Sequence, residues 1–197
     1  MLSRTEICAA RHGETDWNVA GVLQGWSDVM LNDIGRQQAV DMARTMGGEG
    51  FTRICSSSLR RAAETAEIMA REWGMAGPCY HEGLKERNFG AIQGTPKAEL
   101  AELNPRLLQQ ILIRNPAAEF ELGETMDEFA DRVLAAVTSI ADRYPGERLL
   151  LITHGWVLDV LTRHVENLPR SAVLGRKPKN GECVWLAVDE FGIGRLT

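Results

Sequence analysis

The chain contains 197 residues, of which 44% are hydrophobic and 25% are charged, and its formal net charge is −5 at pH 7. A chain of this length and composition can bury a hydrophobic core and is typical of a globular protein. Its acidic balance argues against a general nucleic-acid-binding protein, which would carry an excess of positive charge.

The N-terminal sequence does not resemble a signal peptide, and no apolar run approaches the roughly 20 residues that span a bilayer. We therefore expect a cytoplasmic protein without membrane contact. Four cysteines are scattered along the chain, without a C-x-x-C pair or zinc-ligand spacing: Cys8, Cys55, Cys79 and Cys183. Because cytoplasmic thiols are normally reduced, we expect free cysteines, buried in strand-like surroundings at Cys8, Cys55 and Cys183.

Hydrophobic patterning predicts strands that alternate with helices along the chain. The expected strands are 6–10, 51–55, 148–153 and 183–188, and the expected helices are 33–46, 62–73, 126–144 and 157–165. Ser56, Ser57 and Ser58 offer hydroxyl groups that would cap the helix at 62–73. The alternation predicts an α/β fold, a three-layer α/β/α sandwich around a mostly parallel central sheet.

The chain shows no internal repeat or linker, so we expect a single domain over residues 1–197. Between residues 95 and 122 the regular alternation stops, and Pro96, Pro105 and Pro116 separate short helical pieces. We interpret this segment as an insertion over the edge of the sheet that would act as a lid.

Polar side chains follow three of the predicted strands. Arg11 and His12 follow the first, Arg61 lies shortly after the second, and His154 follows the strand at 148–153. Ligands of open α/β sheets bind at the carboxyl ends of the strands, so we expect these side chains to converge there. Glu86, in a glycine-containing loop, would add a carboxyl group to the same site.

Two histidines, arginines and one carboxyl group suit phosphoryl transfer. The transferring group keeps charged oxygens throughout the reaction, and an arginine fork can bind two of them at once without losing its proton. A neutral imidazole is a competent nucleophile near pH 7 because its reference pKa is about 6.5. A carboxylic acid can protonate the leaving oxygen. With arginines to neutralise the phosphate charge, no metal ion is required.

The sequence resembles the histidine phosphatase superfamily in five blocks that occur in the family's order between about residues 7 and 160. These blocks are Arg11-His12-Gly13-Glu14-Thr15 with its continuation through 17–39, Ser56-Ser57-Ser58-Leu59-Arg60-Arg61-Ala62, Glu86 with Phe89-Gly90 and Gln93-Gly94, Gly123-Glu124-Thr125, and Thr153-His154-Gly155. They match the phosphoglycerate-mutase-like branch, branch 1. One Arg-His-Gly triplet would be weak evidence, whereas five ordered blocks are specific.

The resemblance implies catalytic roles for five residues. His12 would be the nucleophile that becomes a phosphohistidine. Arg11, Arg61 and His154 would complete the phosphate pocket. Glu86 would protonate the leaving oxygen and then, as a base, activate water.

The resemblance also implies a set of substrate-binding residues: Asn18, Gln24, Gly25, Arg87, Lys97 and Gly155. Asn18 and the backbone near Gln24 and Gly25 would border the pocket, and Gly155 would allow a close main-chain approach. Arg87 and Lys97 match family positions that hold a substrate carboxylate, and here they would hold an anionic phosphate ester.

We predict a phosphomonoester hydrolase from this resemblance, with two alternatives. The segment between Glu86 and Gly123 is short, few residues follow His154, and Gln24 resembles the phosphatase-like members. The segment 84–94 followed by Lys97 instead resembles a 2,3-bisphosphoglycerate-dependent phosphoglycerate mutase, although Arg106 and Arg114 match that enzyme's paired arginines only loosely. A non-catalytic phospho-ligand-binding module is the lesser alternative, since the catalytic set is intact.

The prediction includes no metal and no cofactor, except 2,3-bisphosphoglycerate under the mutase alternative. The expected partner is a small phosphorylated metabolite, and neither a nucleic acid nor a membrane is expected. The sequence leaves a homodimer open and does not identify the phosphomonoester.

Overall fold

The computed structural model describes residues 4–175 and 178–196. Within this part of the chain, six strands form one sheet in the order β3-β2-β4-β1-β5-β6. The central strand β4 (Arg148–Thr153) pairs in parallel with β1 (Thr5–Arg11) on one side and with β2 (Arg53–Ser56) on the other. The short β3 (Cys79–Tyr80) pairs in parallel with β2, so the sheet is mostly parallel, as predicted.

The last two strands extend the sheet in the opposite sense. β5 (Cys183–Asp189) runs antiparallel to β1, and β6 (Gly192–Arg195) runs antiparallel to β5. β5 matches the predicted strand at 183–188. β6 was not predicted, because two of its four residues are glycines and its sequence shows no hydrophobic alternation.

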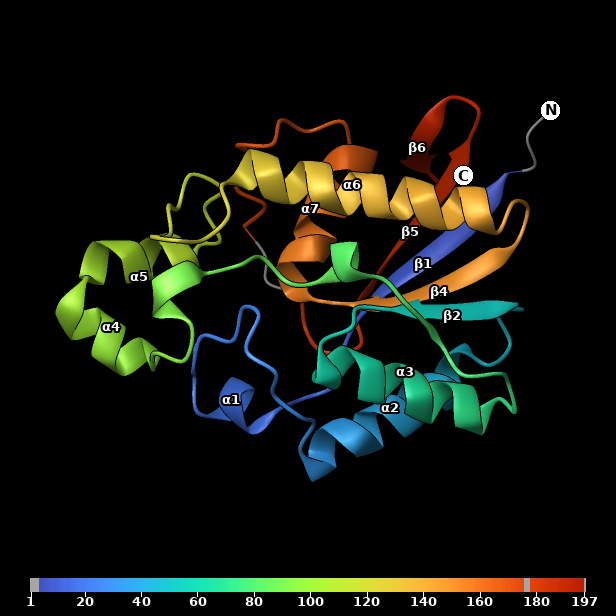
Figure 1. Cartoon of the computed structure of the whole chain (residues 1–197), viewed down its shortest axis with the longest axis horizontal. Helices are drawn as coiled ribbons and strands as arrows, with labels where there is room; N and C mark the ends of the chain where they lie inside the picture. Colours follow the sequence, from blue (N-terminus) through green and yellow to red (C-terminus); the bar gives the residue numbers. More distant parts are fainter. Residues whose placement is uncertain (1–3, 176–177, 197) are drawn as a thin grey trace.

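Two pairs of helices cover the two faces of the sheet (Figure 1). α2 (Asp33–Met46) and α3 (Arg60–Glu72) lie on one face. α6 (Met126–Arg143) and α7 (Gly155–Val165) lie on the other face. The three-layer α/β/α sandwich predicted from the sequence is therefore confirmed.

Alternate residues of the central strands enter two separate hydrophobic clusters, as the two-residue period of a strand requires. Leu149 and Leu151 of β4 pack in the cluster on the side of α6 and α7, which includes Phe129. Leu150 and Ile152 pack on the side of α2 and α3, with Met69. Because both faces of β4 are buried, its sequence is a continuous apolar run.

The ends of the helices show where local sequence sets the structure. Thr125 and Glu128 form a reciprocal capping box at the start of α6. The predicted serine cap of α3 is wrong: the residue at that position is Leu59, which makes no side-chain capping bond. The Ser57 hydroxyl instead accepts a hydrogen bond from the Leu59 amide at 3.3 Å.

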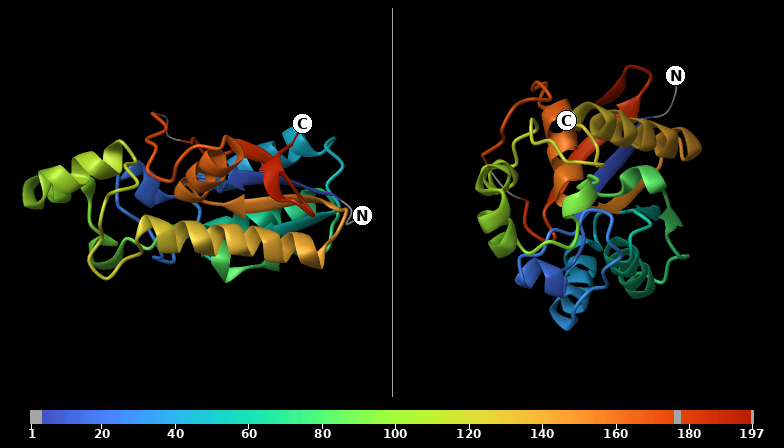
Figure 2. Two further views of the ribbon diagram at one scale, coloured as in Figure 1. Left: turned by 90° about the horizontal axis from the view of Figure 1, so that it is seen from above. Right: turned by 60° about the vertical axis from the view of Figure 1, so that its left-hand side comes forward.

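Short elements occupy the region beyond the carboxyl ends of the parallel strands (Figure 2). They are α1 (Asp16–Val19), the 3-10 helix η2 (Gly90–Ile92), α4 (Lys97–Leu103) and α5 (Pro105–Leu112). Another 3-10 helix, η1 (Glu82–Leu84), packs against α6. α4 and α5 form the insertion expected at 95–122, and a bridge between Val22 and Pro96 joins it to the loop after α1. That this insertion moves as a lid stays a prediction.

The cysteines differ from the expectation. Cys55 and Cys79 are register partners on β2 and β3, with Cα atoms 4.5 Å apart, and they form a disulfide. The prediction of a free thiol is therefore wrong for these two residues, because sequence spacing did not reveal that β3 would pair beside β2. Cys8 is free and buried as expected, whereas Cys183 is free but exposed.

No helix in the described part of the chain is long and apolar enough to cross a membrane.

Candidate active site

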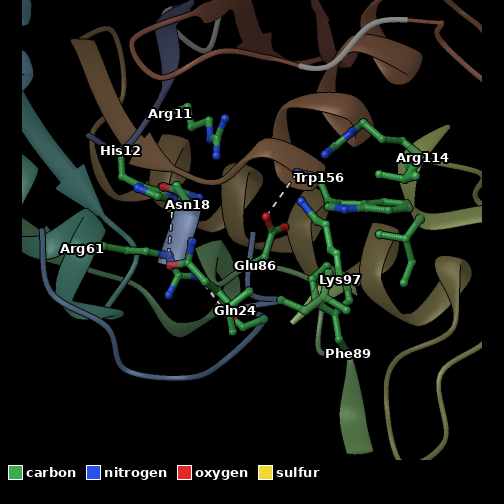
Figure 3. A pocket seen from close by; sticks show the side chains of 15 residues that line it. Arg11, His12, Asn18, Gln24, Arg61, Glu86, Phe89, Lys97, Arg114 and Trp156 are labelled. Atoms are coloured by element: carbon green, nitrogen blue, oxygen red, sulfur yellow. Dashed lines mark hydrogen bonds between the residues drawn. The ribbon is translucent and has the colours of Figure 1, made fainter. Parts of the chain in front are cut away.

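The predicted catalytic residues gather where β1 and β4 end. Helices that follow these two neighbouring strands cover opposite faces of the sheet, which makes their carboxyl ends a topological switch point. A cavity opens there (Figure 3), and Gly25 and the following polar and charged residues line much of it: Arg11, His12, Asn18, Gln24, Arg61, Glu86, Lys97 and Arg114. The structure thus brings together eight of the eleven predicted site residues.

His12 is oriented by its own backbone neighbour. Its Nδ1 lies 2.6 Å from the Gly13 carbonyl oxygen, which can only accept, so Nδ1 carries the proton. Nε2 is then left with a lone pair. Burial, followed by the charges of Arg61 and Arg11, holds the pKa of His12 well below its usual value. His12 is therefore a neutral imidazole whose Nε2 keeps a lone pair.

The loop after His12 is packed tightly against α2 and α3. A Cβ atom on Gly13 would lie 2.4 Å from the Gly35 carbonyl oxygen, so the two backbones touch. The Gly13 amide donates to the Thr65 hydroxyl of α3 at 3.1 Å, and that hydroxyl donates to the Arg61 carbonyl at 2.7 Å. These contacts fix the position of the histidine relative to Arg61.

Arg61 lies at the start of α3 and is 1% exposed. Its Nη1 and Nη2 donate to the carbonyls of Ser27 and Gly25, at 2.9 and 2.7 Å, and its Nε lies 3.3 Å from His12 Nε2. Burial lowers the pKa of Arg61 to about 10, which still leaves it protonated at neutral pH. A full positive charge therefore lies beside His12 Nε2.

Arg11 supplies a second cation to the same cavity. Its Nη1 donates to the Pro178 carbonyl at 2.7 Å, while its Nε is buried without a hydrogen-bond partner among the described residues. Burial lowers the pKa of Arg11, and the nearby charge of Glu86 partly opposes this shift. A positively charged side chain that lines the cavity and keeps one donor without a protein acceptor suits an anionic ligand.

Glu86 faces the histidine from another wall of the cavity (Figure 3). Its carboxyl group accepts hydrogen bonds from the backbone amides of Arg87, at 2.9 Å, and Trp156, at 3.4 Å. Burial raises the pKa of Glu86 against the opposing effect of Arg114 and these amides. The raised pKa favours the protonated carboxyl, the form that a general acid needs.

His154 lies behind the nucleophile rather than on the cavity wall. It is completely buried, and its ring centroid is 5.2 Å from that of His12. Nε2 is 2.8 Å from the Ser57 hydroxyl, and Nδ1 has no hydrogen-bond partner in the part of the chain that the structure describes. Burial, then Arg61 and His12, keeps the pKa of His154 well below its usual value.

Residues 7–194 match the sequence profile of the histidine phosphatase superfamily (branch 1). The chain belongs to this superfamily. The metal-independent phosphoserine phosphatase of Arabidopsis thaliana is 38% identical over 156 residues, which cover 78% of this chain and 66% of that protein. The probable phosphoglycerate mutase GpmB of Shigella boydii is 34% identical over 190 residues, which cover 92% of this chain and 88% of that protein.

Among solved structures, Bacillus stearothermophilus YhfR superposes with a TM-score of 0.86 at 32% identity, over 96% of this chain and 94% of that one. These relatives include enzymes named as phosphatases and as mutases, so this member of the histidine phosphatase superfamily is assigned as an enzyme. The relatives therefore include both of the enzyme classes that the sequence left open, a phosphatase and a phosphoglycerate mutase.

Two residues predicted to bind substrate in this superfamily member do not line the cavity. Arg87 is 1% exposed, and its guanidinium donates to the carbonyls of Ala118 and Glu124 and lies over the rings of Phe120 and Trp156. Arg87 thus links the segment at 118–124 to Trp156 instead of facing the cavity. Gly155 begins α7, where a Cβ atom would come within 3.4 Å of Arg114 Nη2, so its small size leaves room for that guanidinium.

Arg114 is the main site residue that the sequence did not assign. It lies in the segment after α5 with φ +54°, and its Nε donates to the buried carboxylate of Asp159 on α7. Its guanidinium stacks 4.7 Å from the Trp156 ring, and its Nη2 is buried without a hydrogen-bond partner among the described residues. Its only sequence signal was the loose match of Arg114 to one of the paired arginines of phosphoglycerate mutases.

Apolar residues complete the lining of the cavity: Val22, Leu23, Phe89, Ile111, Leu112 and Trp156. Phe89 and Trp156 lie on the side away from His12 (Figure 3). Lys97 and Arg114 stand on the same side, and burial lowers the pKa of Lys97. This part of the superfamily site can hold a small organic group that ends in a negative charge.

Residues 4–175 and 178–196 contain no group of three or more His, Cys, Asp or Glu side chains that could hold a metal ion.

Proposed function

We propose that the chain hydrolyses small phosphomonoesters through a phosphohistidine on His12 Nε2. The observation that carries this proposal is the pairing of protonation states across one cavity: a neutral His12 and a buried Glu86 whose raised pKa favours its acid form. The first step requires a ring nitrogen with a free lone pair and a carboxyl group that can give up a proton.

In the first step, Arg11 and Arg61 bind the phosphate oxygens and neutralise their charge. His12 Nε2 attacks phosphorus, the ester P–O bond breaks, and the Glu86 carboxyl gives its proton to the leaving oxygen. The Nδ1 proton of His12 stays on its hydrogen bond to the Gly13 carbonyl, which stabilises the positive imidazole of the phosphohistidine. The products of this step are an alcohol and the phosphoenzyme.

In the second step, the Glu86 carboxylate takes a proton from water as the water oxygen attacks phosphorus. The N–P bond breaks, inorganic phosphate leaves, and Glu86 is again protonated. Each cycle thus restores both groups and consumes one water. Among the described residues, four cations and one carboxyl group line this cavity, so the charge balance favours an anionic substrate without a metal ion.

We further propose that the substrate carries a second anionic group beside Lys97 and Arg114. Arg114 Nη2 has no hydrogen-bond acceptor in the described structure, and a buried guanidinium donor without an acceptor is costly unless a ligand supplies one. A carboxylate oxygen is a charged acceptor that meets this need. A small phosphorylated hydroxy acid or amino acid therefore fits both ends of the cavity.

The competing function is phosphoglycerate mutase, in which a second substrate hydroxyl captures the phosphohistidine instead of water. Lys97 and Arg114 are compatible with it, because a phosphoglycerate has the required carboxylate. The retained set of His12, Arg61, Glu86 and His154 favours either enzyme over a non-catalytic binding module.

The test is a phosphomonoester panel in EDTA, run beside a coupled 3-phosphoglycerate mutase assay with and without 2,3-bisphosphoglycerate. We expect phosphate release from phosphoserine, 3-phosphoglycerate or a similar ester, unaffected by EDTA. Isomerisation that exceeds hydrolysis when 2,3-bisphosphoglycerate is present would establish the mutase instead. Activity that depends on an added divalent ion would overturn the metal-independent mechanism.

A cytoplasmic location is part of this proposal, and the Cys55–Cys79 disulfide sets a test for it. Reducing compartments normally keep thiols free. Alkylation of thiols at the moment of cell lysis should therefore modify Cys55 and Cys79 if the protein resides there, whereas protected cysteines would place it in an oxidising compartment.

A further inference from the structure

The loop that carries Glu86 is bonded by a side chain from a distant helix. Arg132 lies on α6 and donates to three carbonyl oxygens of the loop: Gly83 at 2.9 Å, Lys85 at 3.1 Å and Glu86 at 3.2 Å. The Trp26 indole donates to the same Glu86 carbonyl at 2.7 Å. The backbone beneath the proposed acid is therefore fixed from both sides.

Glu124, just before α6, holds Arg132 in this position. Its carboxylate accepts two parallel hydrogen bonds from Arg132 Nε and Nη2, at 2.6 and 2.7 Å. The same carboxylate accepts from the Asn88 amide at 2.8 Å, and the Glu124 carbonyl accepts from Arg87. Arg132 and Glu124 together, here called the Arg132–Glu124 brace, thus bond the chain before and after Glu86.

The carboxyl group of Glu86 depends on this backbone path. One of its oxygens is bonded by the amide of the next residue, Arg87, so the carboxyl position follows the local backbone. Proton transfer requires the acid within hydrogen-bond reach of the leaving oxygen, and a displacement of about 1 Å can cost about 100-fold in rate. A guanidinium, with five donors in a rigid fork, can bond three carbonyls and a carboxylate at once, which lysine cannot.

We propose that Arg132, oriented by Glu124, is a positioning residue that places the Glu86 carboxyl for proton transfer to the leaving oxygen. The inference rests on the proposed hydrolysis and concerns the delivery of its proton. An ordinary surface ion pair, by contrast, would contribute little to stability and nothing specific to catalysis.

The test uses kcat/KM, which reports steps up to the first irreversible one, the transfer of phosphate to His12. Two substrates are compared: p-nitrophenyl phosphate, whose leaving group barely needs a proton, and an alkyl phosphate that the wild-type chain hydrolyses. We expect Arg132→Gln to lower kcat/KM for the alkyl phosphate by about 10- to 100-fold. The same variant should change the value for p-nitrophenyl phosphate by less than about threefold, because that reaction does not need the acid.

A double mutant makes the test specific to Glu86. In a Glu86→Gln background the acid is already absent, so adding Arg132→Gln should cause no further leaving-group-dependent loss. The matched control is Arg170→Gln. It removes an exposed arginine that pairs with Asp127 and Asp131 on α6, the helix that carries Arg132. This control should leave both kcat/KM values within about twofold of wild type, as expected for exposed ion pairs.

Equal losses on both substrates, no loss on either, or additive losses in the Glu86→Gln background would each overturn the proposal. If Arg132→Gln does not fold, Glu124→Gln provides a second variant, since it weakens the hold on Arg132 and retains the shape. Failure of the proposed function itself looks different, because then Glu86→Gln alone would show no dependence on the leaving group.

Discussion

The substitution Gly35→Ala tests how tightly α2 packs against the loop that follows His12. A Cβ atom there would lie 2.0 Å from the Glu14 carbonyl oxygen and 2.7 Å from the Glu14 nitrogen. Both atoms belong to the backbone, so no flexible side chain can move aside. The Glu14 backbone is also held by α2, because its amide donates to Gln38 at 2.8 Å and its carbonyl accepts from Asn32 at 3.1 Å.

The size of the effect follows from these distances. The methyl group would stand about 1.4 Å closer to the Glu14 oxygen than the 3.4 Å of an ordinary contact. The first turn of α2 and the loop that follows His12 must separate by roughly that amount. We expect Gly35→Ala to lower the free energy of unfolding by about 1–3 kcal/mol. Displacement of His12 should lower kcat/KM by about 100-fold.

Urea denaturation and hydrolysis of p-nitrophenyl phosphate measure the two effects. The matched control is Gly48→Ala, just beyond the same helix, where a Cβ atom would meet no atom within 4 Å. That control should be neutral or more stable by up to about 1 kcal/mol, with unchanged activity. A Gly35→Ala protein with wild-type stability and activity would refute the claim that this contact positions the nucleophile.

Three further predictions concern other parts of the chain. Arg114→Gln should raise KM for 3-phosphoglycerate about 10- to 100-fold relative to KM for glycerol 3-phosphate, which lacks the carboxylate. The reason is that a hydrogen bond to a charged group contributes about 1.5–3 kcal/mol. An unchanged ratio of the two KM values in steady-state assays would contradict the second anion site. Burial raises the pKa of Glu86 above its ordinary 4.5, so its stabilising contribution is complete below pH 4.5 and is lost as pH rises through the native pKa. Glu86→Gln should therefore gain stability relative to wild type as pH rises, and melting curves with a pH-independent difference would contradict this. Reduction with dithiothreitol should lower the free energy of unfolding by about 3 kcal/mol, because the Cys55–Cys79 disulfide closes a loop with a sequence separation of 24; an unchanged urea midpoint would mean that these cysteines are not linked.

Much of the fold could be predicted because local pattern and tertiary packing agree. The helix at 33–46 and the strand at 148–153 have the predicted bounds. In both, the apolar period and the flanking residues indicate the same element. The predicted serine cap failed because Ser57 serves His154 and the Leu59 amide rather than the first turn of α3.

The site likewise contains residues that could be predicted from the sequence and residues that could not. His12, Arg61 and Glu86 could be predicted because they follow or join elements whose order fixes where they meet. Arg87 could not be placed correctly from its resemblance to a substrate-binding position, since its burial beneath Trp156 is a property of packing.

Arg114 and the Arg132–Glu124 brace depend on contacts between residues far apart in the sequence. Arg114 pairs with Asp159, 45 positions away, and Arg132 bonds carbonyls 46 to 49 positions away. No spacing rule covers such contacts. The side-chain pattern of α6 shows a polar residue at Arg132 and gives no indication of what it bonds.

In the proposed reaction, His12 Nε2 carries the phosphoryl group between the two steps. Rapid quenching of the chain with a phosphomonoester, followed by phosphorus NMR and peptide mapping of the trapped protein, detects this group. We expect a single acid-labile phosphate on His12, bonded through Nε2 because Nδ1 is held by the Gly13 carbonyl. A phosphate on any other residue, or a His12→Ala variant that retains turnover, would contradict it.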